Sequence, residues 1–372
     1  MRFVFFSHSL VSDWNHGNAH FLRGIVRELV NRGHHVRVYE PKDGWSRRNL
    51  LADRGERAVE EFREAFPTLD SHLYDPATID LDLALDGADV VIVHEWNDPD
   101  LIARLGRRRA NGGRFRLLFH DTHHRTMSDP HAMARYDLSA YDGVLAYGAV
   151  IAEISRMMGW GRQAWVWHEA ADTALFRPLE GRPVEGDLVW IGNWGDGERS
   201  VELGEFLLLP IRALKLKARI YGVRYPDDAR SALMLSGAHY AGYLPNHLAP
   251  EAFARFRATV HVPRRYYSES LPGIPTIRVF EALACGIPLV SSPWQDSESL
   301  FRPGTDFLVA SDRTQMESRL RDVLNDDGLR QSLIEHGLET IRSRHTCAHR
   351  VDELIGLCRS LASENPLLME AR

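Results

Sequence analysis

The chain has few cysteines, no long apolar run and no excess of basic residues. Its cysteines, Cys285, Cys347 and Cys358, are odd in number and lack the spacing of metal ligands, which favours a reducing, cytoplasmic location. No segment approaches the roughly 20 apolar residues of a membrane-spanning helix, so we expect a soluble protein for which a peripheral membrane contact stays open. The apolar start "MRFVFFSHSLV" turns polar at Ser12, which is too short for a signal peptide and predicts a first strand.

The charge balance argues against nucleic acid as the main partner. Over 372 residues, 45 basic and 51 acidic side chains give a formal net charge of -6, and the basic run "GRRRANGGRFR" is short. The length and the hydrophobic fraction of 44% are sufficient for two cores of ordinary size. Two domains are therefore expected.

Short β-branched runs alternate with helical patterns along most of the chain. Residues 2–8 and 34–40 read as strands, and residues 20–33 between them carry apolar side chains at helical spacing. Such alternation predicts parallel sheets covered by helices on both faces. The pattern restarts after the Pro/Gly-rich segment 177–187, which reads as a linker.

We therefore predict an α/β fold of two Rossmann-like, doubly wound parallel-sheet domains with a cleft between them. The N-terminal domain is expected over residues 1–175 and the C-terminal one over residues 183–345. Residues 346–372 are expected to form a helix that packs back towards the N-terminal domain. Ligands of this architecture bind at the carboxyl ends of the strands, so the site residues should lie in loops that follow strands.

Two of these loops are suited to an anion. In "SHSLVSDWNHGNAH", Gly17 and Asn18 precede a helix, where backbone N–H groups can approach a negative charge, although helix capping explains them equally well. In "WIGNWGDGERS", Asn193 and Arg199 follow a strand and offer hydrogen-bond donors to a phosphate. The alternative for Arg199 is an ordinary solvated arginine.

A third loop, "FHDTHHRT", is rich in histidine. His120 follows the buried run "RLLF", which would deliver it to the ligand site as a catalytic or binding residue. A metal site is the alternative, with candidate ligands His120, Asp121, His123 and His124, but their spacing matches no strong motif. We predict no metal ligand here.

The fourth loop leads into a short helix, in "LPGIPTIRVFEALACG". Pro275 suits the first helical position, which would leave the N–H groups of the Gly273, Ile274, Pro275 and Thr276 region free for phosphate oxygens. Glu281 lies at the border of the apolar face of this helix. Periodicity alone leaves open an ion pair with Arg278 at spacing i,i+3.

Several segments together resemble group 1 glycosyltransferases of the GT-B fold, and most closely the branch similar to spore maturation proteins. The resemblance covers about residues 1–350 and is carried by "HGNAHFLRGIVRELVNRGHHVRVYEP", "WHEAADTALFRP", "LVWIGNW", "RIYGV", "YAGYLP" and, most specifically, "FEALACGIPLVSS". It implies transfer of a sugar from a nucleoside diphosphate donor (UDP, GDP or dTDP) to an acceptor hydroxyl, with retention and without a required metal or other cofactor. The acceptor would be a glycan, a lipid or a small molecule.

The resemblance also implies roles for individual residues. Glu281 matches the glutamate that accepts hydrogen bonds from the donor ribose. Arg199 matches a basic residue that binds the diphosphate, and His120 matches a histidine close to the transferred sugar. The other residues implied on the donor side are Gly17, Asn18, Asn193, Tyr243 and residues 273–276.

Two positions depart from the family pattern. The glutamate that often lies eight residues before the ribose-binding one is Gly273 here, and Glu269 could replace it only if the loop holds a four-residue insertion. A second basic residue of the diphosphate site is replaced by Asn193.

Two other classes of function stay open. A nucleotide-sugar 2-epimerase or hydrolase on the same fold would use His120, Asp121 and Glu95, and the glycine at position 273 also fits a non-catalytic partner domain. For the transferase we expect front-face attack, since no side-chain nucleophile is evident. The tryptophans of the first half would shape an acceptor pocket or belong to the core or a domain interface, namely Trp14, Trp96, Trp160, Trp165 and Trp167.

Overall fold

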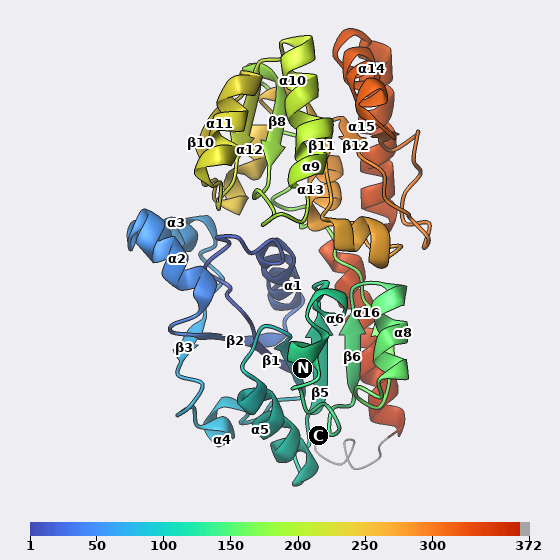
Figure 1. Cartoon of the computed structure of the whole chain (residues 1–372). Helices are drawn as coiled ribbons and strands as arrows, with labels where there is room; N and C mark the ends of the chain where they lie inside the picture. The colour runs from blue at the N-terminus through green and yellow to red at the C-terminus, as the bar shows by residue number, and fades with distance from the viewer. Residues whose placement is uncertain (365–372) are drawn as a thin grey trace. The chain divides into compact units, whose positions relative to one another are not determined.

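The computed structural model describes residues 1–364 and divides into two compact units (Figure 1). Unit 1 consists of residues 1–169 together with the chain from Cys347 onward, and unit 2 of residues 170–346. Residues 365–372, the end of the predicted C-terminal helix, lie outside the described residues. No helix in the described chain combines the length and the apolar character needed to cross a bilayer.

Unit 1 is built on a parallel sheet with strand order β3-β2-β1-β4-β5-β6-β7. The strands are β1 (Arg2–Phe6), β2 (His35–Pro41), β3 (His72–Tyr74), β4 (Val90–His94), β5 (Arg116–Asp121), β6 (Gly143–Ala146) and β7 (Ala164–Val166). The helices are α1 (Ala19–Asn31), α2 (Trp45–Arg54), α3 (Arg57–Ala65), α4 (Leu81–Ala84), α5 (Pro99–Ala110), α6 (Arg125–Ser128), α7 (Pro130–Met133), α8 (Ala149–Met157) and α16 (Cys347–Glu364).

The central strands β1, β4 and β5 are buried except for the first residue of β1 and of β5, as the apolar runs predicted. Every residue of β4, "VVIVH", is buried, because helices cover both faces of a parallel sheet. β1 pairs with β2 on one side and with β4 on the other, so the strand order reverses between β1 and β4. Loops after these two strands diverge at the carboxyl edge and leave room for a ligand there.

Unit 2 repeats the plan with strand order β10-β9-β8-β11-β12-β13. The strands are β8 (Gly186–Ile191), β9 (Ala218–Tyr221), β10 (His239–Gly242), β11 (Phe256–His261), β12 (Leu289–Ser291) and β13 (Leu308–Val309). The helices are α9 (Ser200–Leu203), the π-helical turn η1 (Gly204–Leu208), α10 (Leu209–Leu214), α11 (Asp227–Ser236), the 3₁₀ turn η2 (Asn246–Leu248), α12 (Ala249–Phe253), the π-helical turn η3 (Tyr266–Ser270), α13 (Ile277–Cys285), α14 (Arg313–Asn325) and α15 (Asp327–Arg344). Its order reverses between β8 and β11, which pair directly.

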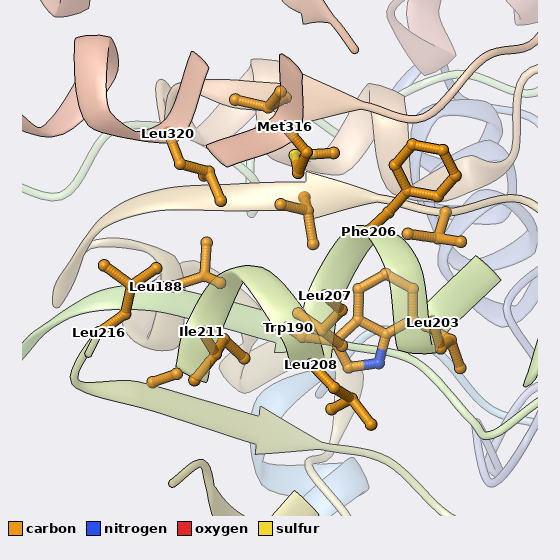
Figure 2. Close-up of a cluster of buried hydrophobic side chains, with 14 of the residues drawn as sticks. Leu188, Trp190, Leu203, Phe206, Leu207, Leu208, Ile211, Leu216, Met316 and Leu320 are labelled. Carbon is orange, nitrogen blue, oxygen red and sulfur yellow. The ribbon is translucent and has the colours of Figure 1, made fainter. Parts of the chain in front are cut away.

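The core of unit 2 lies where the helical segment α9–α10 and helix α14 meet the sheet. Figure 2 shows Leu207 and Ile211 of the first segment, Met316 and Leu320 of α14, and Trp190 of β8 as members of one cluster of buried side chains. These side chains are buried and pack in one cluster, so the strand ends that carry the site are held by a continuous apolar layer. The expected architecture of two parallel-sheet α/β domains is confirmed.

One local expectation was wrong. Pro275 is not the first helical residue: α13 begins at Ile277, with Thr276 as the extended N-cap residue at φ -77° and ψ 158°. Threonine is a favoured N-cap residue, but its hydroxyl bonds to His261 instead of capping the helix (Oγ1 to Nε2, 3.0 Å). The N–H of Gly273 was also expected to be free, yet it donates to the carbonyl of Gln295 at 2.6 Å.

Candidate functional site

Two arginines meet at the carboxyl edge of unit 2, at the strand-order reversal. Arg199, in the loop after β8, donates from Nη2 to the backbone oxygen and to Oδ1 of Asn193, both at 2.7 Å. Arg264, in the loop after β11, donates from Nη2 to the same Oδ1 at 3.3 Å. The amide oxygen of Asn193 therefore draws two guanidinium groups together.

Arg199 is buried and held from several sides. Its Nη1 donates to the carbonyl of Val262 at 2.9 Å, and its guanidinium lies 5.2 Å from the centre of the Trp190 ring. Gly195, at φ +92°, makes room for it, since a Cβ there would lie 2.6 Å from Arg199 Cγ. Burial and then the charge of Arg264 lower the pKa of Arg199 to about 10.

One nitrogen of the Arg199 guanidinium makes no hydrogen bond. Within the described chain, Nε of Arg199 is buried and has no hydrogen-bond partner. A buried donor without a partner costs free energy. An anion bound beside Arg199 would accept a hydrogen bond from this Nε. It would also reduce the repulsion between the positive charges of Arg199 and Arg264.

His261, the last residue of β11, connects the strand to the N-terminus of α13. Its Nδ1 lies 2.9 Å from Ser291 Oγ and its Nε2 lies 3.0 Å from Thr276 Oγ1. Burial, followed by the charges of Arg199 and Arg278, lowers the pKa of His261 to about 3. The imidazole is therefore neutral at physiological pH and positions the helix terminus without adding charge.

Glu281 is more buried than its position on the helical wheel predicted. Its side chain has no exposed surface, because a neighbouring loop and an arginine cover it. Asn246 Nδ2 donates to Oε1 at 2.7 Å, and Arg278 Nη1 donates to Oε2. The i,i+3 ion pair left open by periodicity is thus present, and Asn246 holds the other carboxylate oxygen.

Gly273 has a backbone conformation that strains any other residue, and a side chain there would have to displace two neighbouring side chains. Its φ is +90°, and a Cβ there would lie 2.7 Å from Ser297 Oγ and 2.9 Å from Glu298 Oε1. The carboxylate next to this glycine is therefore that of Glu298. Glu269 is instead exposed on the turn η3.

The remaining residues expected on the donor side of unit 2 are close in sequence to Thr276 or to Asn246. Ile274 is buried and Pro275 precedes the N-cap of α13. Tyr243 is half-buried just after β10, three residues before Asn246, the residue that contacts Glu281.

Unit 1 carries a second cluster of polar residues at its own strand-order reversal. Four imidazoles form a row, which we call the histidine row: His8 after β1, His16 before α1, His94 in β4 and His120 in β5. Successive ring centres along it are 4.9, 6.0 and 5.7 Å apart. Trp167 closes the inner end, 4.9 Å from His120, and Trp96 lies at the outer end, 6.0 Å from His8.

The histidine row is uncharged at neutral pH. Burial lowers the pKa of His8 to about 4 and that of His120 to about 3, and burial together with neighbouring histidines holds the pKa of His94 well below its usual value. The pKa of His16 is also strongly lowered, chiefly by burial. Within the described residues, Nε2 of His16 and Nε2 of His120 are buried without hydrogen-bond partners, which leaves two imidazole nitrogens for a ligand.

Two carboxyl groups flank His120. Glu95 follows β4 and Asp121 ends β5, and both are fully buried. Burial and the nearby Asp121 raise the pKa of Glu95 well above its usual value, and burial raises the pKa of Asp121 to about 7. Thr122 donates its N–H and its hydroxyl to Glu95 Oε1, at 2.9 and 3.2 Å.

The loop that carries Gly17 and Asn18 is clamped from two sides. Glu40 Oε2 accepts from Leu10 N at 2.6 Å and from Ser9 Oγ at 2.8 Å, while the fully buried Arg23 donates Nε to Leu10 O at 2.8 Å. Gly17 is exposed in front of α1. The side-chain amide of Asn18 donates to Glu169 at 3.0 Å instead of capping that helix.

The metal alternative has no geometric support. Among the described residues, no three His, Cys, Asp or Glu side chains come together as a group that could hold a metal ion.

The structure thus groups Arg199, Asn193, Thr276 and Glu281 in unit 2, and His120 with the Gly17 loop in unit 1. Sequence reasoning missed Asn246, His261, Arg264 and Glu298. His261 and Arg264 could have been found, because they end and follow a predicted strand. Asn246 and Glu298 approach the site from loops with no pattern of their own.

Comparison with solved structures identifies the fold as that of the GT-B glycosyltransferases. Sucrose-phosphate synthase from Thermosynechococcus elongatus matches with a TM-score of 0.66 and 14% identity, over 98% of this chain and 100% of that one. HepE from Anabaena, in complex with UDP and glucose, matches with a TM-score of 0.65 and 13% identity, over 97% and 100%. T4 phage beta-glucosyltransferase, in complex with UDP and Mn²⁺, matches with a TM-score of 0.61 and 11% identity, over 98% and 99%.

The sequence itself matches a family model over part of its length. Residues 199–356, less than half of the chain, match the family described as glycosyl transferase-like. No curated protein matches significantly. The branch similar to spore maturation proteins is named by none of these matches and stays a prediction.

Proposed function

We propose that the chain is a glycosyltransferase that moves a sugar from a nucleoside diphosphate donor to an acceptor hydroxyl. One observation carries the proposal: at the strand-order reversal of unit 2, Arg199 and Arg264 meet at Asn193 Oδ1, and the charges of Arg199 and Arg278 act on His261 beside the N-terminus of α13. Arg264 is also paired with Glu198 at 2.7 Å, so Arg199, with its unpartnered Nε, is the main anion ligand. Guanidinium groups and the N–H groups of a helix terminus are suited to phosphate oxygens. The loop residues Asn193, Gly273, Ile274 and Thr276 frame this diphosphate site.

The chemistry follows from the charge of the leaving group. Negative charge grows on the diphosphate as the glycosidic bond breaks, so positive groups fixed in advance stabilise the transition state more than the ground state. We propose that the arginines and the helix terminus perform this task without a required metal. Because one structural neighbour is in complex with UDP and Mn²⁺, this part needs a test in EDTA.

We propose UDP as the donor nucleotide and Glu281 as the acceptor of hydrogen bonds from the ribose. UDP is named with two of the structural neighbours. Asn246 and Arg278 fix the Glu281 carboxylate from two sides, which leaves it preorganised for two adjacent hydroxyls. Tyr243, in the same segment as Asn246, would contribute to the nucleotide pocket.

We propose a sugar contact within each unit, His120 in unit 1 and Glu298 in unit 2, each to be tested by itself. His120 is neutral and has an unpartnered Nε2, which suits a hydrogen bond to a sugar hydroxyl. Glu298 occupies the space beside Gly273, and we assign to it the sugar contact that Glu269 was expected to supply. We propose that the reaction retains the configuration of the sugar by front-face attack, with the acceptor proton passing to the departing phosphate. We also propose a cytoplasmic location, which fits the three buried free thiols.

The ribose contact is tested by calorimetric titration of UDP and 2′-deoxy-UDP in EDTA. The wild type should prefer UDP, and Glu281→Gln should bind UDP about 10- to 100-fold more weakly and lose most of that preference, since charge-assisted hydrogen bonds contribute roughly 1.5 to 3 kcal/mol. Asp306→Asn is the matched control. Asp306 is also fully buried in unit 2 and paired with an arginine, accepting from Arg302 Nε at 3.0 Å.

The outcomes separate binding from folding. Both variants should lose stability, because each leaves an arginine without its buried carboxylate, but Asp306→Asn should keep the wild-type preference for UDP. A Glu281→Gln protein that discriminates the two nucleotides as well as the wild type contradicts the ribose role. Absence of UDP binding by the wild type contradicts the proposed donor.

A nucleotide-sugar 2-epimerase or hydrolase is the second candidate. It is favoured by the two buried carboxyl groups, Glu95 and Asp121, beside His120, because groups of raised pKa can exchange protons near neutral pH. NMR of UDP-sugar incubations separates the classes. An epimeric sugar without UDP release indicates the epimerase, whereas UDP release that an acceptor accelerates indicates the transferase.

A further inference from the structure

Trp96 is an exposed aromatic ring at the outer end of the histidine row. It follows β4 directly, and 42% of its surface is accessible, which is unusual for so large an apolar side chain. Its backbone N–H donates to His94 Nδ1 at 3.4 Å. The ring therefore lies where ligands of a doubly wound sheet bind, not on a remote surface.

The ring is held in place from beneath and from its edges. The guanidinium of Arg125 lies 4.5 Å from its centre, and His123 meets it edge-on with ring centres 5.2 Å apart. Arg125 is itself anchored, because its Nη1 donates to Tyr136 Oη at 2.8 Å and to Glu95 O at 3.3 Å. Trp96 is thus a preorganised platform, which loses little side-chain entropy when a ligand stacks on it.

The surroundings of the platform suit a neutral ligand with hydroxyl groups. The π face of the indole carries partial negative charge and attracts the weakly positive C–H face of a pyranose ring. His8, which contacts Trp96, is a neutral imidazole, and such a ring offers one donor and one acceptor to sugar hydroxyls. Arg125 already donates to Tyr136 and to the Glu95 carbonyl, so it offers little to a polyanion here.

We propose that Trp96 is the stacking platform of an acceptor subsite that binds a neutral pyranose, with His8 beside it contacting the sugar hydroxyls. The acceptor is then a carbohydrate or a glycoside with an uncharged terminal sugar. Its identification as the acceptor, as distinct from a bound sugar, rests on the proposed transferase function. The row from Trp96 through His8, His16 and His94 to His120 gives such a sugar a line of neutral polar groups.

The subsite is tested with the full-length protein by saturation-transfer difference NMR. The probes are methyl α-D-glucopyranoside, methyl α-D-galactopyranoside and methyl α-D-mannopyranoside. Trp45→Ala is the matched control, because Trp45 is also in unit 1, is 39% exposed and makes an edge contact with Trp14 at 5.3 Å. At least one glycoside should give signals with the wild type and with Trp45→Ala, at least fivefold weaker signals with Trp96→Ala, and intermediate ones with Trp96→Phe.

The other outcomes overturn the proposal. The proposal is wrong if Trp96→Ala gives signals as strong as the wild type, or if no glycoside gives a signal with the wild type. It is also wrong if a duplex oligonucleotide, and no glycoside, binds in a Trp96-dependent way. Hydrogen exchange of residues 1–31 shows whether unit 1 of the variants is folded, and UDP titration of the same samples separates the two hypotheses. Intact UDP binding without glycoside binding removes only the acceptor subsite, and glycoside binding without UDP binding removes only the donor assignment.

Discussion

At the residue scale, the least ordinary position is Gly273, where a positive φ and two neighbouring side chains disfavour a Cβ. The nearest carboxylate is that of Glu298, 2.9 Å from the place a Cβ would take, whereas Glu269 is exposed on η3. A carboxylate delivered from another loop occupies the space that a side chain at position 273 would fill. Its function as a sugar ligand follows only if its removal affects the sugar and spares the nucleotide.

We predict that Glu298→Gln lowers kcat/KM for the UDP-sugar about 10- to 100-fold, because a lost charge-assisted hydrogen bond to the sugar costs roughly 1.5 to 3 kcal/mol. The affinity for UDP, which lacks the sugar, should stay unchanged. Glu269→Gln is the control and should retain wild-type kinetics. Equal losses in the two variants, or weaker UDP binding by Glu298→Gln, would show that the assignment is wrong.

At the scale of elements, β11 and α13 are joined through His261, whose two ring nitrogens contact Ser291 and Thr276. The folded state keeps this imidazole neutral with a pKa of about 3, below the ordinary 6.5. Below pH 6.5, His261 takes up a proton in the unfolded chain but not in the folded one. The free energy of unfolding therefore decreases as the pH is lowered, until the pKa of folded His261 is reached. The helix terminus of the phosphate site is therefore sensitive to acid.

We predict that His261 alone lowers the free energy of unfolding by about 2 kcal/mol between pH 7 and pH 5, since 1.5 pH units below 6.5 correspond to roughly 1.36 kcal/mol each. His261→Gln lacks this titration and should lose about 2 kcal/mol less than the wild type over the same interval. Urea denaturation at both pH values gives the difference. Identical pH dependence of the two proteins would mean that His261 titrates normally in the folded state.

At the scale of the whole molecule, the last helix belongs to unit 1 although the chain reaches it through unit 2. α16 packs against α1, Arg32 at the C-cap of α1 pairs with Asp352 at 2.5 Å, and Trp167 Nε1 donates to Arg350 O at 2.9 Å. Leu354 of α16 is fully buried. The stability of unit 1 thus depends on a segment that is more than 300 residues from β1.

We predict that Leu354→Ala destabilises unit 1 by about 2 to 5 kcal/mol, the usual cost of a cavity at a buried leucine. Hydrogen exchange read by mass spectrometry should accelerate in residues 1–31 and much less in residues 186–261. Leu333→Ala, at a buried position of α15 in unit 2, is the matched control and should show the reverse pattern. Equal acceleration of both segments by Leu354→Ala would contradict independent units.

Much of the fold could be predicted from the sequence, because its signals are local. Strands such as β4 and β6 are nearly continuous apolar runs, and α1 repeats its apolar residues at helical spacing, so their type and order follow from neighbouring residues. The start of α13 was misplaced by two residues, because Thr276 is held in an extended conformation and its hydroxyl contacts His261, 15 positions away.

The candidate site was predictable in part for the same reason. Arg199 and Asn193 were named because they follow a strand, and the structure does place them in contact. Asn246 was not named, since its contact with Glu281 spans 35 positions and leaves no periodic signal. The same holds for the histidine row, whose members come from four separate segments.

The sequence by itself determined the alternation of strands and helices, the repetition of that plan and the loops in which polar residues follow strands, because local patterning specifies these features. Only the tertiary structure decided that Glu281 is wholly buried, that Glu298 lies beside Gly273 and that four histidines form one row ending at an exposed Trp96. These features depend on which strand ends become neighbours. Which strand ends become neighbours is decided by the pairing of strands that are far apart in the sequence. This pairing depends on tertiary packing, which no short segment specifies by itself.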